Sequence, residues 1–224
     1  MTGPSKIILA WSGGKDSCLA LHELLRSEEF QIVSLLTTVT RDYARISMHG
    51  VRQELLEAQS ASLRLPLDRV LIPKGADNRT YEAAMAEALL SWRERGVMRI
   101  AFGDLFLEDV RAYRERMLAP LGIEALFPLW RRDTRECAHL FLKLGFRAVV
   151  VCADASKLEA HFTGREYDES FLRDLPEGID PCGENGEFHT FVYDGPLFSE
   201  AVRFTIGERV ERDGFHFCDL VPQA

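Results

Sequence analysis

The chain has 224 residues, of which 46% are hydrophobic and 28% are charged, and its formal net charge at pH 7 is −8. This is the composition of a globular protein with one α/β domain, or a larger domain with a small second one, and no window approaches the roughly 18 continuous apolar residues of a membrane span. The acidic balance argues against sequence-independent nucleic-acid binding, because such binding depends on Lys and Arg meeting phosphates.

Apolar runs typical of buried strands alternate with stretches of helical periodicity. Strands or extended segments are predicted at 6–10, 31–40, 68–72, 99–102, 125–130 and 147–152, and helices at 16–27, 52–65, 78–95 and 134–144, with one more helix after Gly103-Asp104. This alternation predicts a parallel sheet with helices on both faces. Ligands of such sheets lie beyond the carboxyl ends of the strands, so the turn after the first strand, the segment 40–50 and Gly103-Asp104 are candidates for one shared site.

The character of the chain changes after about residue 154. Short polar segments lead to predicted strands at 188–193, 202–206 and 215–221, and Asp213-Gly214 predicts a tight turn between the last two. We therefore expect two domains, a nucleotide-binding domain at 1–145 and a smaller α+β acceptor domain at 146–224 that closes over the sheet edge.

Five cysteines are widely spaced and include no C-x-x-C pair. This spacing argues against a zinc site and against a disulfide framework, so we expect reduced thiols, several of them buried. The apolar run near the N-terminus has no cleavage-site pattern, which favours a cytoplasmic protein.

The turn after the first strand, S-G-G-K-D-S at residues 12–17, has the features of an anion receptor. Its glycines permit unusual backbone conformations, and the N–H groups at the start of the next helix attract an anion. Lys15 adds a positive charge, while Ser12 and Ser17 add hydroxyl groups. A carboxylate at Asp16 would repel phosphate unless a divalent cation lay between them, which predicts Mg²⁺. The spacing excludes a Walker A loop, and the alternative is a structural Gly-Gly turn.

This turn resembles the signature of the PP-loop ATP pyrophosphatases, which cleave ATP between the α- and β-phosphates. The resemblance implies a Rossmann-like (HUP-type) domain, ATP and Mg²⁺ as cofactors, release of pyrophosphate, and transfer of AMP to a substrate oxygen. Lys15 and Asp16 would be catalytic, with Asp16 also a ligand of Mg²⁺. The candidate ATP-binding residues are Ser12, Gly13, Gly14, Lys15, Asp16, Ser17, His49, Gly103 and Asp104.

Weaker candidates, which are His49, Asp104 and an arginine pair on the helix after Asp104, have structural alternatives. His49 follows the second strand and could be a hydrogen-bonding residue at a helix start. Asp104 could accept a hydrogen bond from adenosine or position Mg²⁺, or it could cap the following helix. Arg111 and Arg114 share a face of that helix, where they could hold phosphate or the acceptor, or be solvated surface charge.

A second motif, D-P-C-G-E-N-G-E-F-H-T-F-V at 180–192, is dense in carboxylates and glycines. Glu184 and Glu187 could orient a cation, an amine or ammonia and are candidate catalytic residues; the alternative is a surface turn rich in Asn and Gly. The segment is similar to the G-E-G-G-E-x-E-T-F-V motif of diphthine–ammonia ligases, which amidate diphthine on elongation factor 2. This chain departs from the motif at two positions, because Asn185 stands where the ligases usually have Gly and His189 where they usually have Glu. The resemblance covers about residues 6–206.

The two motifs together imply an enzyme that adenylates a substrate carboxylate and transfers ammonia to it. The acceptor would be protein-borne diphthine or a small molecule, with nucleic acid and membrane not expected as partners and a homodimer possible. Two alternatives are a PP-loop tRNA-modifying enzyme and a non-catalytic adenine-nucleotide-binding module. Binding of tRNA with an affinity that falls steeply as the salt concentration rises would favour the tRNA-modifying enzyme. Binding of ATP without isotope exchange between pyrophosphate and ATP would favour the binding module.

Overall fold

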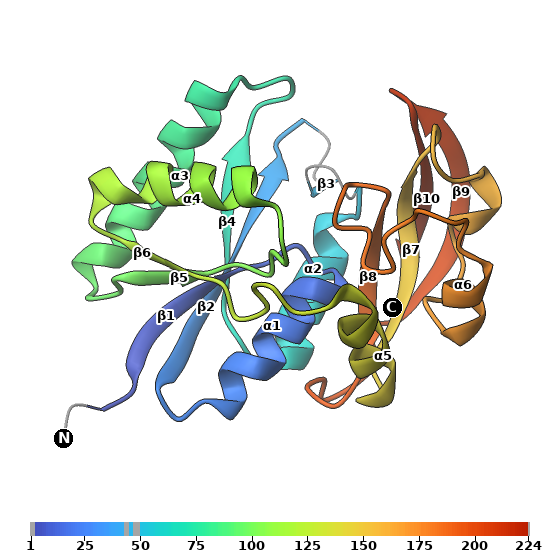
Figure 1. Ribbon diagram of the computed structural model, residues 1–224. Helices are drawn as coiled ribbons and strands as arrows, with labels where there is room; N and C mark the ends of the chain where they lie inside the picture. Colours follow the sequence, from blue (N-terminus) through green and yellow to red (C-terminus); the bar gives the residue numbers. More distant parts are fainter. Residues whose placement is uncertain (1–2, 43–44, 47–49, 224) are drawn as a thin grey trace.

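Two sheets, one mostly parallel and one antiparallel, form the framework of the protein (Figure 1). The structure is a computed structural model and describes residues 3–42, 45–46 and 50–223. Strands of the first sheet are β1 (Ser5–Ala10), β2 (Phe30–Thr40), β3 (Arg45–Ile46), β4 (Leu67–Ile72), β5 (Arg99–Ala101) and β6 (Glu124–Leu126). β1 pairs in parallel with β2 and β5, β5 with β6, and β2 with β4. The predicted parallel sheet is confirmed, with short β3 added antiparallel to β2.

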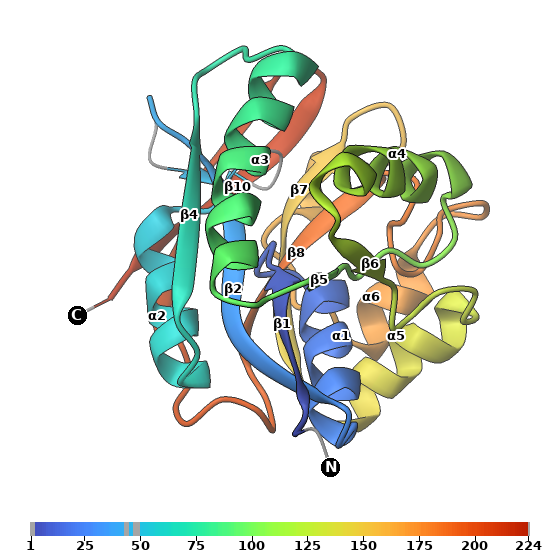
Figure 2. The ribbon, with the colours of Figure 1, turned by 90° about the vertical axis from the view of Figure 1, so that its left-hand side faces the viewer.

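Helices cover both faces of this sheet (Figure 2). The helices of the described chain are α1 (Lys15–Arg26), α2 (Gln53–Leu63), α3 (Asn78–Glu94), α4 (Glu108–Leu118), α5 (Thr134–Lys143) and α6 (Glu169–Asp174), with 3-10 turns at Ala119–Leu121 and Ala160–Phe162. Helix α6 lies beside the second sheet (Figure 1). Side chains alternate along β1, so Ile7 and Leu9 pack with α1 and α2 while Ile8 packs with α3 and α4. None of the helices in the described part of the chain is long and apolar enough to cross a membrane.

The second sheet contains β7 (Arg147–Asp154), β8 (Phe188–Asp194), β9 (Phe204–Arg212) and β10 (Phe215–Pro222), in the order β8-β7-β10-β9. Asp213 and Gly214 join β9 to β10 with φ of 54° and 80°, which confirms the predicted tight turn. Apolar residues of β7 and β8 share one core with those of α1, α2 and α5. The smaller sheet is therefore packed against the α1 side of the first sheet.

Several local predictions need correction. β9 runs to Arg212 instead of ending at 206, and β6 ends at Leu126 because a turn follows, with the Trp130 N–H bonded to the Phe127 carbonyl. The sequence also favours Asn78 as the cap of the helix at 78–95, but Asn78 is the first residue of α3 and Asp77 is the cap, because its side chain accepts a hydrogen bond from the Thr80 N–H. The short elements β3 and α6 were not predicted.

Candidate active site

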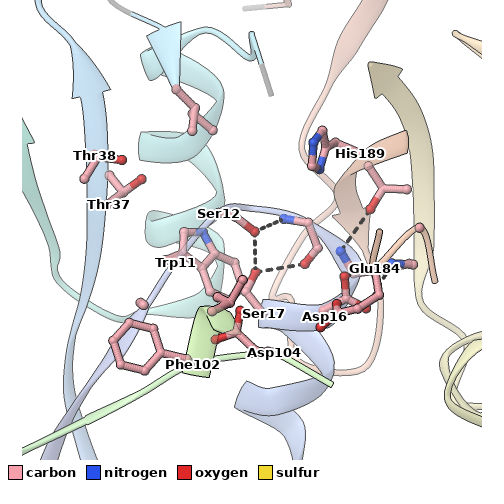
Figure 3. Close-up of a pocket in the computed structure, with 18 of the residues that line it drawn as sticks. Trp11, Ser12, Asp16, Ser17, Thr37, Thr38, Phe102, Asp104, Glu184 and His189 are labelled. Carbon is pink, nitrogen blue, oxygen red and sulfur yellow. Dashed lines mark hydrogen bonds and ion pairs between the residues drawn. The ribbon is translucent and has the colours of Figure 1, made fainter. Parts of the chain in front are cut away.

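A cavity of about 420 Å³ lies at the carboxyl ends of β1, β2 and β5, and the second sheet closes one side of it (Figure 3). Its lining from the first part of the chain includes Trp11, Ser12, Gly14, Lys15, Asp16, Ser17, Thr37, Thr38, Phe102, Gly103, Asp104 and Arg114. Its lining from the second motif includes Cys182, Gly183, Glu184, Gly186, Phe188, His189 and Thr190. The two predicted motifs, far apart in sequence, thus border one cavity.

The turn before α1 presents polar groups to this cavity. The Gly14 N–H donates to Ser12 Oγ at 3.2 Å, the Ser12 and Ser17 hydroxyls lie 3.2 Å apart, and Ser17 Oγ donates to the Gly14 carbonyl at 2.9 Å. The cap residue of α1 is Gly14, which has no side chain to bond the first N–H groups of the helix. Because the first N–H groups of a helix have no partner within it, this end of α1 suits an anion.

Glycine is required where the backbone is crowded around the turn. Gly13 has φ of 76°, and a Cβ there would lie 2.7 Å from Gln59 Oε1. A Cβ on Gly103 would lie 2.9 Å from the carbonyl carbon of Asp16. The chain after β5 therefore approaches the first turn of α1 more closely than a side chain would allow.

Lys15 is buried, and its Nζ donates to the two carboxylate oxygens of Asp16 at 2.9 and 2.8 Å and to the Cys182 carbonyl. Its Nζ also lies 5.5 Å from the centre of the Phe188 ring. Burial lowers the pKa of Lys15, but the charge and hydrogen bond of Asp16, together with the charges of other nearby acidic groups, outweigh this effect, so the pKa is raised. Burial, aided by the charges of nearby carboxylates, raises the pKa of Asp16 despite Lys15. The site therefore holds a fixed cation among acidic groups.

Asp104 forms an ion pair with Arg114, whose Nε and Nη2 donate to its carboxylate at 2.6 and 3.0 Å. The Arg114 guanidinium lies 4.2 Å from the centre of the Phe102 ring. Asp104 does not cap α4, because the cap position is Leu107 and no side chain bonds there. Arg111, by contrast, pairs with Glu115 and is not part of the cavity lining. Of the two arginines that the sequence grouped, one borders the cavity.

The carboxylates of the second motif have different surroundings. Glu184 Oε1 accepts a hydrogen bond of 2.7 Å from the Leu105 N–H, so it joins the second motif to the segment after β5. Burial, with the charges of Asp16 and Asp104, raises the pKa of Glu184 to about 7. Glu187 is 2% exposed and is absent from the described lining. Its Oε1 accepts from the Asn185 side chain at 2.9 Å, while its Oε2 has no partner among the described residues.

Strand β8 also contacts the turn at residues 12–17 directly. Thr190 Oγ1 accepts a hydrogen bond of 3.0 Å from the Lys15 N–H, and the Val192 N–H donates to the Gly13 carbonyl at 2.9 Å. Neither residue was predicted to have a role, although both fall within the E-x-E-T-F-V pattern. Thr37 on β2 was not predicted either, and its buried hydroxyl lines the cavity without a hydrogen-bond partner in the described structure.

Two expectations concern histidine and metal. His49 lies outside the described residues, whereas His189 lines the cavity and Asn185 is turned toward Glu187. Within residues 3–42, 45–46 and 50–223, no three His, Cys, Asp or Glu side chains form a group that could hold a metal ion. A cation at Asp16 would therefore need oxygen ligands from a bound substrate.

Comparison with known proteins gives matches over both parts of the chain. Residues 5–125 match the diphthamide synthase N-terminal domain, and residues 133–220 match the diphthamide synthase C-terminal domain. A diphthine–ammonia ligase of Danio rerio is 27% identical over 221 residues, which cover 89% of this chain and 86% of that protein. The Homo sapiens ligase is 26% identical over 85% of this chain and 79% of its own length. The Schizosaccharomyces pombe ligase is 25% identical over 98% of this chain, which spans 39% of that protein.

Proposed function

Since the chain belongs to the diphthamide synthase family, we propose that it is an ATP-dependent, AMP-forming ligase that converts a carboxylate to an amide with ammonia. One observation carries this proposal: the anion-binding turn and Glu184 border the same cavity. The proposed acceptor is diphthine on a protein, because the relatives in three organisms are named diphthine–ammonia ligases.

The residues present fit ATP. A cavity of about 420 Å³ is within the usual size range of nucleotide and small-molecule sites. The start of α1, where Gly14 offers no side-chain cap, and the hydroxyls of Ser12 and Ser17 suit the phosphates. The buried hydroxyl of Thr37 on β2, which has no partner among the described residues, suits a polar atom of the nucleoside.

The acidic groups fit Mg²⁺. Mg²⁺ is commonly bound by one or two carboxylates together with substrate phosphates, and Asp16 and Asp104 both line the cavity. The negative charge of Asp104 contributes to the raised pKa of Asp16, and a cation would relieve this repulsion. Asp16 and Asp104 would hold the metal, which would neutralise charge on the phosphates.

In the first step, an oxygen of the acceptor carboxylate bonds to the α-phosphorus, and the bond to the bridging oxygen of the β-phosphate breaks. Pyrophosphate leaves with that electron pair, and an acyl-adenylate forms. Lys15, the Gly14 N–H and the hydroxyls beside it are preorganised donors for the charge that develops on the leaving group. Their fixed positions reduce the reorganisation needed during the reaction.

In the second step, the nitrogen of ammonia bonds to the acyl carbon, and AMP leaves with the electron pair of the broken C–O bond. Glu184 takes a proton from the attacking nitrogen. A pKa of about 7 suits this role, because a general base is most effective when its pKa is close to the operating pH. We propose that residues 1–145 hold the nucleotide and residues 146–224 receive the acceptor.

The test is product analysis with ATP, an ammonium salt and either diphthine-bearing elongation factor or small carboxylates. We expect AMP, pyrophosphate and amide in equal amounts. ADP as the product would refute the assignment. Nucleotide binding without AMP formation or pyrophosphate–ATP exchange would indicate a binding module, and AMP formation that requires tRNA would indicate a tRNA-modifying enzyme.

A further inference from the structure

Gln59, on helix α2, is a fully buried polar side chain to which the proposed mechanism assigns no role. Its Oε1 accepts a hydrogen bond of 3.0 Å from the Trp11 indole N–H. Its Nε2 donates to the Gly13 carbonyl at 3.0 Å and to the Val192 carbonyl at 2.5 Å. One amide therefore connects the end of β1, the anion-binding turn and β8.

The Gly13 carbonyl is the part of the turn that this amide fixes. It accepts hydrogen bonds from both Gln59 Nε2 and the Val192 N–H. In a trans peptide the carbonyl and the following N–H point in opposite directions. With the Gly13 carbonyl held on the side of α2 and β8, the Gly14 N–H points the other way, toward Ser12 Oγ and the cavity.

This orientation has to be imposed from outside the turn. Two successive glycines have more backbone freedom than any other pair of residues, and Gly13 adopts φ of 76°. The contact with α2 is also close, because a Cβ on Gly13 would meet both Gln59 Oε1 at 2.7 Å and Leu56 Cδ2 at 2.8 Å. The turn is thus set against α2 by packing and by hydrogen bonds to Gln59.

We propose that Gln59 is a positioning residue that orients the Gly13–Gly14 peptide so that the Gly14 N–H and the neighbouring hydroxyls receive the phosphates. It acts through the turn and does not touch the nucleotide. This inference rests on the proposed function, in which the ligand of the turn is the pyrophosphate end of ATP.

The test compares Gln59→Met, which keeps the length of the side chain and removes its hydrogen bonds, with Gln53→Met. Gln53 lies on the same helix and donates to Glu57 at the surface. Calorimetry measures the binding of pyrophosphate and of adenosine to each variant. We expect Gln59→Met to lose about tenfold or more in affinity for pyrophosphate and about 10- to 100-fold in pyrophosphate–ATP exchange. Its adenosine affinity should stay unchanged, and Gln53→Met should match the wild type throughout.

Gln59→Glu provides a second readout and decides the matter if Gln59→Met does not fold. When ionised, the introduced side chain would place a carboxylate against two carbonyl oxygens, whereas its protonated form regains a donor. Burial raises the pKa of such a group. Relative to the wild type at each pH, the pyrophosphate affinity of Gln59→Glu should therefore recover as the pH falls.

Unchanged pyrophosphate affinity in Gln59→Met would overturn the proposal, and so would a parallel loss of adenosine affinity, which indicates general damage. If only Gln59→Glu folds, the proposal would be overturned by a ratio of its pyrophosphate affinity to that of the wild type that is the same at every pH. A wild-type protein that binds pyrophosphate but forms none from ATP would refute the ligase function and leave the role of Gln59 to be judged from binding.

Discussion

Lys15 and Asp16 are adjacent in sequence, and their paired side chains both line the cavity. Lys15→Met would remove the cation that faces the leaving pyrophosphate. We expect pyrophosphate–ATP exchange to fall about 10²- to 10³-fold, the usual effect of losing one preorganised donor. Lys15→Arg should not restore it, because the Nζ is enclosed by the Cys182 carbonyl and the Phe188 ring. Lys6→Met, at the exposed far end of β1, is the control. Exchange at the wild-type rate in Lys15→Met would contradict the proposed role.

The pKa of Glu184 predicts the pH dependence of amide formation. Because burial and the charges of Asp16 and Asp104 raise this pKa to about 7, the carboxylate gains its basic form as the pH rises through 7. We expect kcat/KM, calculated per unprotonated ammonia, to rise through this pH and then level off. Glu184→Gln should lower kcat about 10²- to 10⁴-fold and abolish the inflection.

Glu187→Gln is the matched control for that measurement, because Glu187 lies in the same loop but outside the described cavity lining. It should keep the inflection near pH 7. Loss of the inflection in Glu187→Gln and its retention in Glu184→Gln would reverse the assignment of the base.

Single residues could be predicted where their chemistry is contiguous in sequence. The turn at 12–17 combines two glycines, a lysine and two hydroxyls between a strand and a helix, and the structure places it at the cavity. The choice between Glu184 and Glu187 was not predictable, because an irregular loop has no periodicity to show which side chain faces inward. Gln59 was missed for another reason. It lies in a helix, and its partners come from distant segments.

The contact of β8 with the start of α1 is testable through Thr190. Thr190→Val keeps the shape of the side chain but leaves the Lys15 N–H without its acceptor. A buried donor without a partner costs about 1–3 kcal/mol, so the free energy of unfolding should fall by that amount in urea titrations. Thr190→Ser retains the hydroxyl and should recover most of the loss. Equal stabilities of the Val and Ser variants would show that the hydrogen bond contributes little.

Whole elements were predicted where an apolar pattern marks them. The buried runs of β1, β2 and β7 alternate with amphipathic helices, and the order of these elements is as predicted. The second half of β9 was missed because Glu208, Arg209, Glu211 and Arg212 are exposed on an edge strand with no alternating pattern. The turn at Asp213-Gly214 was predicted correctly because its residue types tolerate positive φ.

At the scale of the molecule, the sequence predicted a smaller second domain that closes over the edge of the first sheet, but not which residues join the two sheets. The contacts between the two sheets include Leu105 with Glu184 and Gly13 with Val192, which are about 80 and 180 positions apart in the sequence. No local sequence pattern indicates such contacts. The shared core of α1, α2, β7 and β8 depends on the same long-range packing. Since the site is formed from both lobes, its geometry depends on how firmly they are held together.

One ion-pair cluster holds the lobes together away from the cavity. Asp219 on β10 accepts hydrogen bonds from Arg45 on β3 at 2.8 Å and from Arg52, just before α2, at 2.7 and 3.1 Å. These bonds, chiefly that from Arg52, lower the pKa of Asp219. A carboxylate whose pKa is lowered by folding stabilises the folded state at pH values above the ordinary carboxyl pKa of about 3.9. This contribution is lost as the pH falls through the lowered pKa of the folded protein.

Asp219→Asn should therefore reduce the free energy of unfolding at pH 7 by about 1 kcal/mol, a modest value because the arginines are partly exposed and salt screens the pair. The difference from the wild type, measured by urea titration, should shrink below about pH 4, where the carboxylate of the wild type also becomes protonated. Asp213→Asn, at the exposed β9–β10 turn where Asn tolerates positive φ, is the control and should leave stability unchanged. If the free energy of unfolding of Asp219→Asn stays below that of the wild type by the same amount from pH 7 to acidic pH, the stabilisation comes from the packing of Asp219 and not from its charge.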